Sequence, residues 1–153
     1  MQGATLKQDN GRYYEDRMEI MSTQQSPGGS TFPYYYKGGE IHCLKYGSFF
    51  SDEEALFALM KAEEIFIAEP NRQLLIWVDF YETKLTDKVL SEFVESINRI
   101  RPHIIKLAIV GCSFWEKRRL SFIGKKSGKG LPTPTRFFTD PEDAKTWLVG
   151  ESF

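Results

Sequence analysis

Hydrophobic positions follow two alternating patterns over most of the chain. Residues 74–78 and 104–110 are apolar runs, interrupted only by Lys106, and such runs are typical of strands buried on both faces of a sheet. Between them, apolar residues recur three and four positions apart, which predicts an amphipathic helix. The stripe of this central helix comprises Val89, Leu90, Phe93, Val94 and Ile97. Similar stripes at 55–62 and 144–148 predict two further helices.

Residues with helix-capping chemistry precede these three helices and a fourth, basic segment. The N-cap candidates are Ser51, Thr86, Ser113 and Asp140. Both serines are followed three positions later by a glutamate, as in a capping box. Residues 32–36 and 41–50 flank a Gly-Gly turn and predict a hairpin, and 135–139 predict a last strand. This order indicates an α/β fold with a mixed sheet of four or five strands and about four helices.

The first 31 residues differ from the rest of the chain. They include a polar, turn-rich run at 24–30 and only scattered apolar residues, with 13–21 as one local element. We therefore expect an irregular N-terminal extension over 1–31 and one α/β domain over 32–153. A chain of 153 residues with 41% hydrophobic and 27% charged residues suits a single globular domain.

Three stretches carry a resemblance to a known family. They are Leu75-Ile76-Trp77-Val78-Asp79 before one helix, residues 106–111 before another, and the closing strand and helix at 136–148. In this order and spacing, residues 32–149 resemble STAS domains. They are most similar to the SpoIIAA-like group of anti-sigma-factor antagonists, whose architecture is related to that of CRAL-TRIO lipid-binding domains.

The resemblance implies a non-catalytic regulatory module that acts through protein contacts, including self-association. In classical members, a partner kinase phosphorylates a Ser or Thr at the start of the helix after the central strand. The equivalent stretch here, residues 82–87, lacks the Asp-Ser-Ser-Gly turn of those members. Only Thr86 lies near the required place, so it is the candidate phosphoacceptor.

Polar residues around the start of the central helix form the predicted binding surface. They are Asp79, Glu82, Thr83, Thr86 and Asp87. A phosphate on Thr86 would gain from the helix N-terminus, whereas the alternative role of this threonine is a plain N-cap. Asp79 ends a buried strand, where α/β proteins often bind ligands. A small enzyme built on Asp79 and Glu82 is therefore a further hypothesis, but no histidine falls at ligand spacing, and we expect no catalytic residue, metal or cofactor.

A basic segment with one tryptophan is the second candidate surface, for anions or lipid. Its residues are Trp115, Lys117, Arg118, Arg119, Lys125, Lys126 and Lys129. The glycine and lysine spacing at 124–130 does not match a phosphate-binding loop, and a solvated charged loop is the alternative interpretation. The net charge of −1 argues against nucleic acid as a partner.

The expected partner is another protein or a second copy of the chain. Aromatic residues make up 14% of the sequence, which favours, as an alternative function, the binding of an apolar small molecule or lipid in a cavity. No apolar segment approaches the roughly 20 residues needed to span a bilayer, and no signal peptide is recognisable. We therefore expect a cytoplasmic protein, with Cys43 and Cys112 as reduced thiols.

Overall fold

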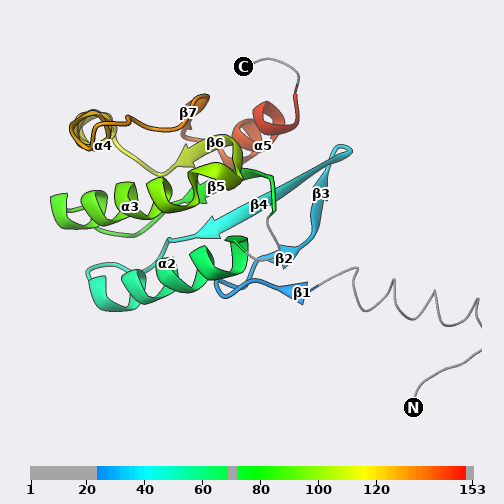
Figure 1. Cartoon of the computed structure of the whole chain (residues 1–153), viewed down its shortest axis with the longest axis horizontal. Helices are drawn as coiled ribbons and strands as arrows, with labels where there is room; N and C mark the ends of the chain where they lie inside the picture. Colours follow the sequence, from blue (N-terminus) through cyan, green and yellow to red (C-terminus); the bar gives the residue numbers. More distant parts are fainter. Residues whose placement is uncertain (1–23, 69–71, 151–153) are drawn as a thin grey trace, which may run out of the picture.

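The computed structural model describes residues 24–68 and 72–150 (Figure 1). In chain order, its elements are β1 (Gln24–Gln25), β2 (Thr31–Phe32), β3 (Tyr34–Tyr36), β4 (Gly39–Lys45), α2 (Glu53–Ala68), β5 (Leu74–Asp79), α3 (Asp87–Ile100), the 3₁₀ turn η1 (Arg101–His103), β6 (Ile104–Val110), α4 (Phe114–Lys126), β7 (Thr135–Phe138) and α5 (Pro141–Val149). The predicted α/β class is confirmed.

Five strands form one mixed sheet in the order β3-β4-β5-β6-β7. The hairpin partner β3 is antiparallel to β4, and the other neighbours are parallel. Lys37 and Gly38 form the two-residue turn, and both have positive φ (47° and 86°), as a hairpin turn that follows the strand twist requires. The predicted hairpin and the buried parallel strands are both present.

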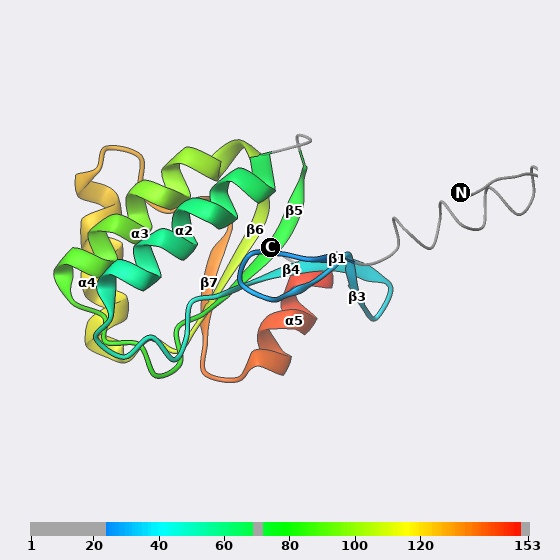
Figure 2. The same ribbon diagram turned by 90° about the horizontal axis from the view of Figure 1, so that it is seen from below.

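The helices divide between the two faces of the sheet, as Figure 2 shows. β4 to β7 are parallel neighbours in sequence order, so right-handed crossovers place α2, α3 and α4 together on one face. α5 follows the last strand and covers the other face. Alternate residues of each strand supply the two cores: Ile76 packs under the three helices, and Trp77 packs towards α5.

Lys106 is a charged residue inside the otherwise apolar strand β6. It is only 2% exposed, and its Nζ donates to the carbonyl oxygens of Trp147 (2.8 Å) and Gly150 (3.1 Å) at the end of α5. A cation at the carboxyl end of a helix is favoured by the helix dipole. Burial lowers the pKa of Lys106, and the nearby Arg136 lowers it further.

The predicted helix caps are correct at three of four positions. Thr86 and Asp140 accept hydrogen bonds from the first turns of α3 and α5, and Ser113 forms the complete capping box with Glu116. At α2, Asp52 takes the capping role predicted for Ser51, since its Oδ1 accepts from the Ala55 N–H at 3.1 Å. A carboxylate one residue later matches the same donors, so the helix start shifts by one position.

Residues 24–31, expected in the irregular extension, belong to the packed domain. β1 and β2 pair as a short antiparallel hairpin, and Ser26 and Ser30 are each 4% exposed. Glu63 of α2, fully buried, accepts from the Ser26 hydroxyl and the Gly28 N–H, both at 2.8 Å. The packed domain therefore includes residues 24–31, whereas the predicted local element at 13–21 lies outside the described residues.

Candidate functional site

Two loops at the carboxyl end of the parallel strands are joined through their backbones. They are residues 46–51, after β4, and residues 80–85, after β5, and we call them the double loop. Ser48 N–H donates to the Tyr81 carbonyl at 2.6 Å, and Phe50 N–H donates to the Glu82 carbonyl at 2.9 Å. Lys84 N–H donates back to the Phe50 carbonyl at 2.7 Å. Each loop therefore fixes the conformation of the other.

Side chains strengthen the same junction. The Thr83 hydroxyl donates to the Tyr46 carbonyl at 2.6 Å and accepts from the Phe49 N–H at 3.1 Å. The Ser48 hydroxyl donates to Glu82 Oε1 at 3.2 Å. Thr83 is half-buried, so the two hydrogen bonds of its hydroxyl group are partly shielded from competing water. The double loop is thus a rigid feature held by both polar side chains and backbone groups.

The backbone of the double loop is held in an unusual conformation. Ser48, Phe50 and Glu82 have φ values of 63°, 53° and 59°, in the left-handed region that side-chain-bearing residues seldom adopt. Each such residue costs about 1–3 kcal/mol and persists only where its surroundings over-determine it. Strain of this kind clusters at binding and catalytic sites.

Two glycines permit close approach to the loop after β5: Gly47 from the loop after β4, and Gly111 from the end of β6. A Cβ on Gly47 would lie 2.6 Å from the Tyr81 carbonyl oxygen, and one on Gly111 would lie 3.0 Å from the Tyr81 nitrogen. Gly111 also has a φ of 98°. The backbone at Tyr81 is therefore enclosed from both sides by residues that lack a side chain.

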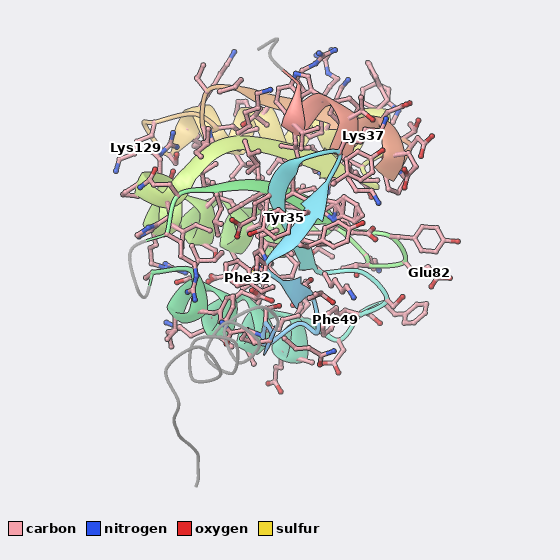
Figure 3. All side chains as sticks on the ribbon, turned by 90° about the vertical axis from the view of Figure 1, so that its right-hand side faces the viewer. Phe32, Tyr35, Lys37, Phe49, Glu82 and Lys129 are labelled. Atoms are coloured by element: carbon pink, nitrogen blue, oxygen red, sulfur yellow. The ribbon has the colours of Figure 1, made fainter. Side chains whose placement is uncertain are left out.

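This rigid backbone presents two large aromatic side chains to solvent. Phe50 is 61% exposed and Tyr81 is 65% exposed, whereas the neighbouring Phe49 packs against the main core. Phe50 also lines a shallow hollow of about 340 Å³. The hollow is completed by Ser51, Glu82, Thr83 and Lys84. Figure 3 shows Phe49 and Glu82 on the same side of the molecule.

The five predicted surface residues are gathered near the double loop, but their polar groups serve different purposes. Asp79 Oδ1 accepts from the Tyr81 N–H at 2.9 Å, which closes an Asx turn. Thr83 holds the loop junction, as described above. Glu82 is exposed, and Asp87 is exposed and paired with Arg119 at 2.9 Å. Asp79 is half-buried, so Glu82 and Asp87 are the more exposed carboxylates of the set.

Thr86 has a complete set of local partners. Its Oγ1 accepts from the Val89 N–H at 3.1 Å and donates to Glu53 Oε2 at 3.0 Å. A phosphate at this oxygen would gain from the start of α3 but would face the Glu53 carboxylate at hydrogen-bonding distance. The N-cap role is therefore shown, and phosphorylation of Thr86 stays a prediction.

The predicted basic surface is spread along α4 rather than gathered at one point. A helix of 13 residues is about 20 Å long, so Trp115 at its start is far from Lys126 at its end. Lys129 lies in the loop beyond, and Figure 3 places it on the opposite side of the molecule from Glu82. Arg119 points towards α3, where it pairs with Asp87 and donates to the Leu85 carbonyl.

Two other hollows bear on the predicted ligand cavity. One, of about 420 Å³, lies between α3 and α4 and is lined by charged residues that include Glu95 and Lys126. The second, of about 200 Å³, lies beside α5 and has Cys43 and Trp77 in its wall. The Lys145 ammonium lies 5.0 Å from the centre of the Trp77 ring and 2.9 Å from Glu142. Neither hollow is the purely apolar cavity that a lipid chain requires.

Among the described residues, no group of three histidine, cysteine or carboxylate side chains is placed to hold a metal ion. None of the helices in residues 24–68 and 72–150 is long and apolar enough to cross a membrane. Comparison with protein-family models, curated proteins and solved structures finds no significant match to this chain. The functional argument therefore depends on the geometry.

The sequence did not indicate that Tyr81 belongs to the site. It also did not indicate that Phe50 is exposed whereas Phe49 packs against the core. An aromatic residue just after the end of a predicted buried strand was a usable signal for Tyr81. For Phe50 no such signal exists, because its exposure depends on the left-handed backbone at that residue.

Proposed function

We propose that this protein is a non-catalytic interaction module that binds a partner protein through the double loop. The observation that carries the proposal is the exposure of Phe50 and Tyr81 on a backbone that is strained and doubly hydrogen-bonded. The location, beside the start of α3, is also the one that the resemblance to STAS domains implies. The regulatory role comes from that resemblance alone.

Rigid aromatic side chains are well suited to protein recognition. Aromatic residues dominate the few positions that contribute most of the binding free energy at interfaces, and tyrosine is especially enriched there. A backbone fixed before binding lowers the entropy lost on association. Glu82 and Lys84 line the same hollow as Phe50 and provide the polar rim that such a surface normally has.

The non-catalytic part of the proposal is supported by the state of the reactive groups. Asp79 closes a turn, so its carboxylate is already engaged by Tyr81. Burial raises the pKa of the Cys112 thiol to about 12, and burial likewise raises the pKa of Cys43. Both thiols therefore stay protonated near neutral pH, where they are weak nucleophiles.

A site-specific cross-linking experiment tests the proposal. The photoreactive residue benzoylphenylalanine is placed at position 50, 81 or 65 in the full chain expressed in its own host. Ile65 is the matched control, because it is 62% exposed but lies on α2 away from the double loop. We expect a discrete protein adduct from positions 50 and 81 that is absent from position 65.

Competition decides whether that adduct is specific. Excess unlabelled wild-type protein should suppress the adduct, and excess of the double variant Phe50→Ser/Tyr81→Ser should not. An adduct at twice the protomer mass would identify a second copy as the partner, which sedimentation equilibrium of the two proteins then checks. Equal adducts from all three positions, or none from 50 and 81, would contradict the proposal.

The hollow of about 200 Å³ beside α5 favours a second candidate function, the binding of a small molecule. Its volume of about 200 Å³ is below the usual range for drug-sized ligands, so it suits a ligand of fragment size. Trp77 and Tyr34 supply flat apolar walls, and Lys45 and Lys145 supply charge. Native mass spectrometry of gently purified protein should detect a stoichiometric adduct, and a bare mass would count against this candidate.

A further inference from the structure

The outer side of α4 consists entirely of aromatic and basic residues. Successive residues of a helix are rotated by about 100°, so six positions share the side opposite the buried Leu120 and Gly124. They are Phe114, Trp115, Arg118, Phe122, Lys125 and Lys126, and all six are exposed. An ordinary solvated helix has acidic and small polar residues on this side as well.

The three aromatic rings are largely exposed to solvent, and Phe122 also borders the hollow between α3 and α4. Phe114, Trp115 and Phe122 are 58%, 69% and 64% exposed. The rings of Phe114 and Trp115 contact each other edge to face, with centres 5.2 Å apart. Arg118 and Lys126 lie 5.7 Å and 5.8 Å from the ring centres of Phe114 and Phe122. Two of the three cations on this side of the helix are thus paired with an exposed ring.

Charge in the chain is strongly segregated onto this region. Residues 114–136 contain seven basic side chains and one acidic side chain, whereas the whole chain has a net charge of −1. The single acidic residue, Glu116, is used in the capping box, where its carboxylate accepts from the Ser113 N–H at 2.8 Å. The outer side of α4 is therefore positive on a protein that is otherwise acidic.

We infer that the outer side of α4 binds the surface of an anionic lipid bilayer. A helix that combines basic residues with tryptophan and phenylalanine suits the membrane interface, where rings enter the acyl boundary and cations contact lipid phosphates. The long aliphatic side chains of Arg118, Lys125 and Lys126 allow their charged groups to contact those phosphates while the aromatic rings insert into the acyl boundary. Three protruding apolar rings on one helix favour a bilayer over a nucleic acid duplex, which offers them no apolar layer.

Vesicle sedimentation tests this inference with the full chain. We expect the protein to bind vesicles of phosphatidylcholine with about 30 mol % phosphatidylserine at low salt, to release as salt is raised, and not to bind phosphatidylcholine alone. Each basic residue near an anionic surface contributes about a fivefold change in partitioning, so Arg118→Ser/Lys125→Ser should weaken binding about 25-fold. Both side chains are exposed, so the fold should be unaffected.

Fluorescence locates the contact on the helix. Trp115 is the exposed tryptophan among the described residues, since Trp147 is 6% exposed and Trp77 is half-buried. Vesicle binding should therefore shift the emission to the blue in the wild type, and Trp115→Phe should abolish the shift while it preserves most of the binding. The variant Phe50→Ser/Tyr81→Ser should bind vesicles like the wild type, which separates this surface from the double loop.

Three outcomes would overturn the inference. One is the absence of binding to phosphatidylserine vesicles at low salt. Another is binding that Arg118→Ser/Lys125→Ser does not weaken. The third is tight binding of a mixed-sequence RNA or DNA oligonucleotide by a protein that ignores the vesicles, which would assign the basic side of α4 to nucleic acid instead.

Discussion

Replacing Glu63 by alanine removes the acceptor that holds the N-terminal hairpin against α2. The carboxylate is fully buried, with Oε2 accepting from Ser26 and Gly28 and with Oε1 3.1 Å from His42 Nε2. In Glu63→Ala, the Ser26 hydroxyl and His42 Nε2 stay buried without this partner. Removing one member of such a buried group costs about 3–5 kcal/mol, a large part of the 5–15 kcal/mol that stabilises a typical domain.

Urea denaturation followed by tryptophan fluorescence measures that loss. Lys61→Ala is the matched control, because Lys61 lies exposed on the same helix and its replacement should change stability by less than about 0.5 kcal/mol. Hydrogen exchange adds a local readout, since amides of residues 26–30 should exchange faster in Glu63→Ala than in Lys61→Ala. A loss below about 1 kcal/mol, with unchanged exchange in the hairpin, would refute the assigned role of Glu63.

Three further perturbations address the cap of α3, the ion pair between Glu64 and Arg99, and the double loop. Thr86→Ala should cost about 1 kcal/mol, a Tm decrease of about 2–4 °C by calorimetry, whereas Thr86→Ser should keep the cap. Burial raises the pKa of Glu64, but hydrogen bonds from Arg99 and Ser96 outweigh burial and leave the pKa below 4.5. The wild type should therefore be more stable than Glu64→Gln above pH 4.5, and this advantage should vanish as the pH falls through the lowered pKa. Urea titrations from pH 7 to pH 3 measure the difference. Gly47→Ala places a Cβ 2.6 Å from the Tyr81 carbonyl, so it should destabilise the domain by about 1–3 kcal/mol and weaken cross-linking from position 50.

The parts of the fold that follow local rules were predictable from sequence. The apolar stripe of α3 is buried at every predicted position, because a period of 3.6 residues fixes which side chains face the sheet. The caps at Thr86, Ser113 and Asp140 follow from the chemistry of a single side chain next to free backbone N–H groups.

Features that depend on contacts between residues far apart in the sequence could not be predicted from local patterns. Glu63 and Glu64 are consecutive acidic residues, which a hydrophobicity pattern assigns to solvent, yet both are buried because each meets partners more than 30 positions away. The hairpin at 24–32 is polar in composition, and it packs because Glu63 satisfies its donors and Phe32 enters the main core. Similarly, the exposure of Phe50 depends on bonds to Glu82 and Lys84, which no local pattern encodes.

The two proposed surfaces can be occupied together. Gly111, three residues before the start of α4, packs against the backbone of Tyr81, so the two surfaces border the same edge of the sheet but consist of different residues. We expect a bilayer that lies along α4 to leave Phe50 and Tyr81 accessible, because neither residue belongs to the outer side of that helix. Binding to vesicles should then concentrate the double loop on a surface, and a partner on the same surface should associate at lower bulk concentration.

This coupling gives a last test once cross-linking has identified the partner. Phosphatidylserine vesicles should increase cross-linking of a membrane-bound partner from position 81 in the wild type but not in Arg118→Ser/Lys125→Ser. Tyr81→Ser carrying the cross-linker at position 50 should cross-link weakly with or without vesicles, because it lacks a recognition side chain rather than a membrane contact. If vesicles instead suppress cross-linking in the wild type, the bilayer covers the double loop, and the geometry inferred for the two surfaces is wrong.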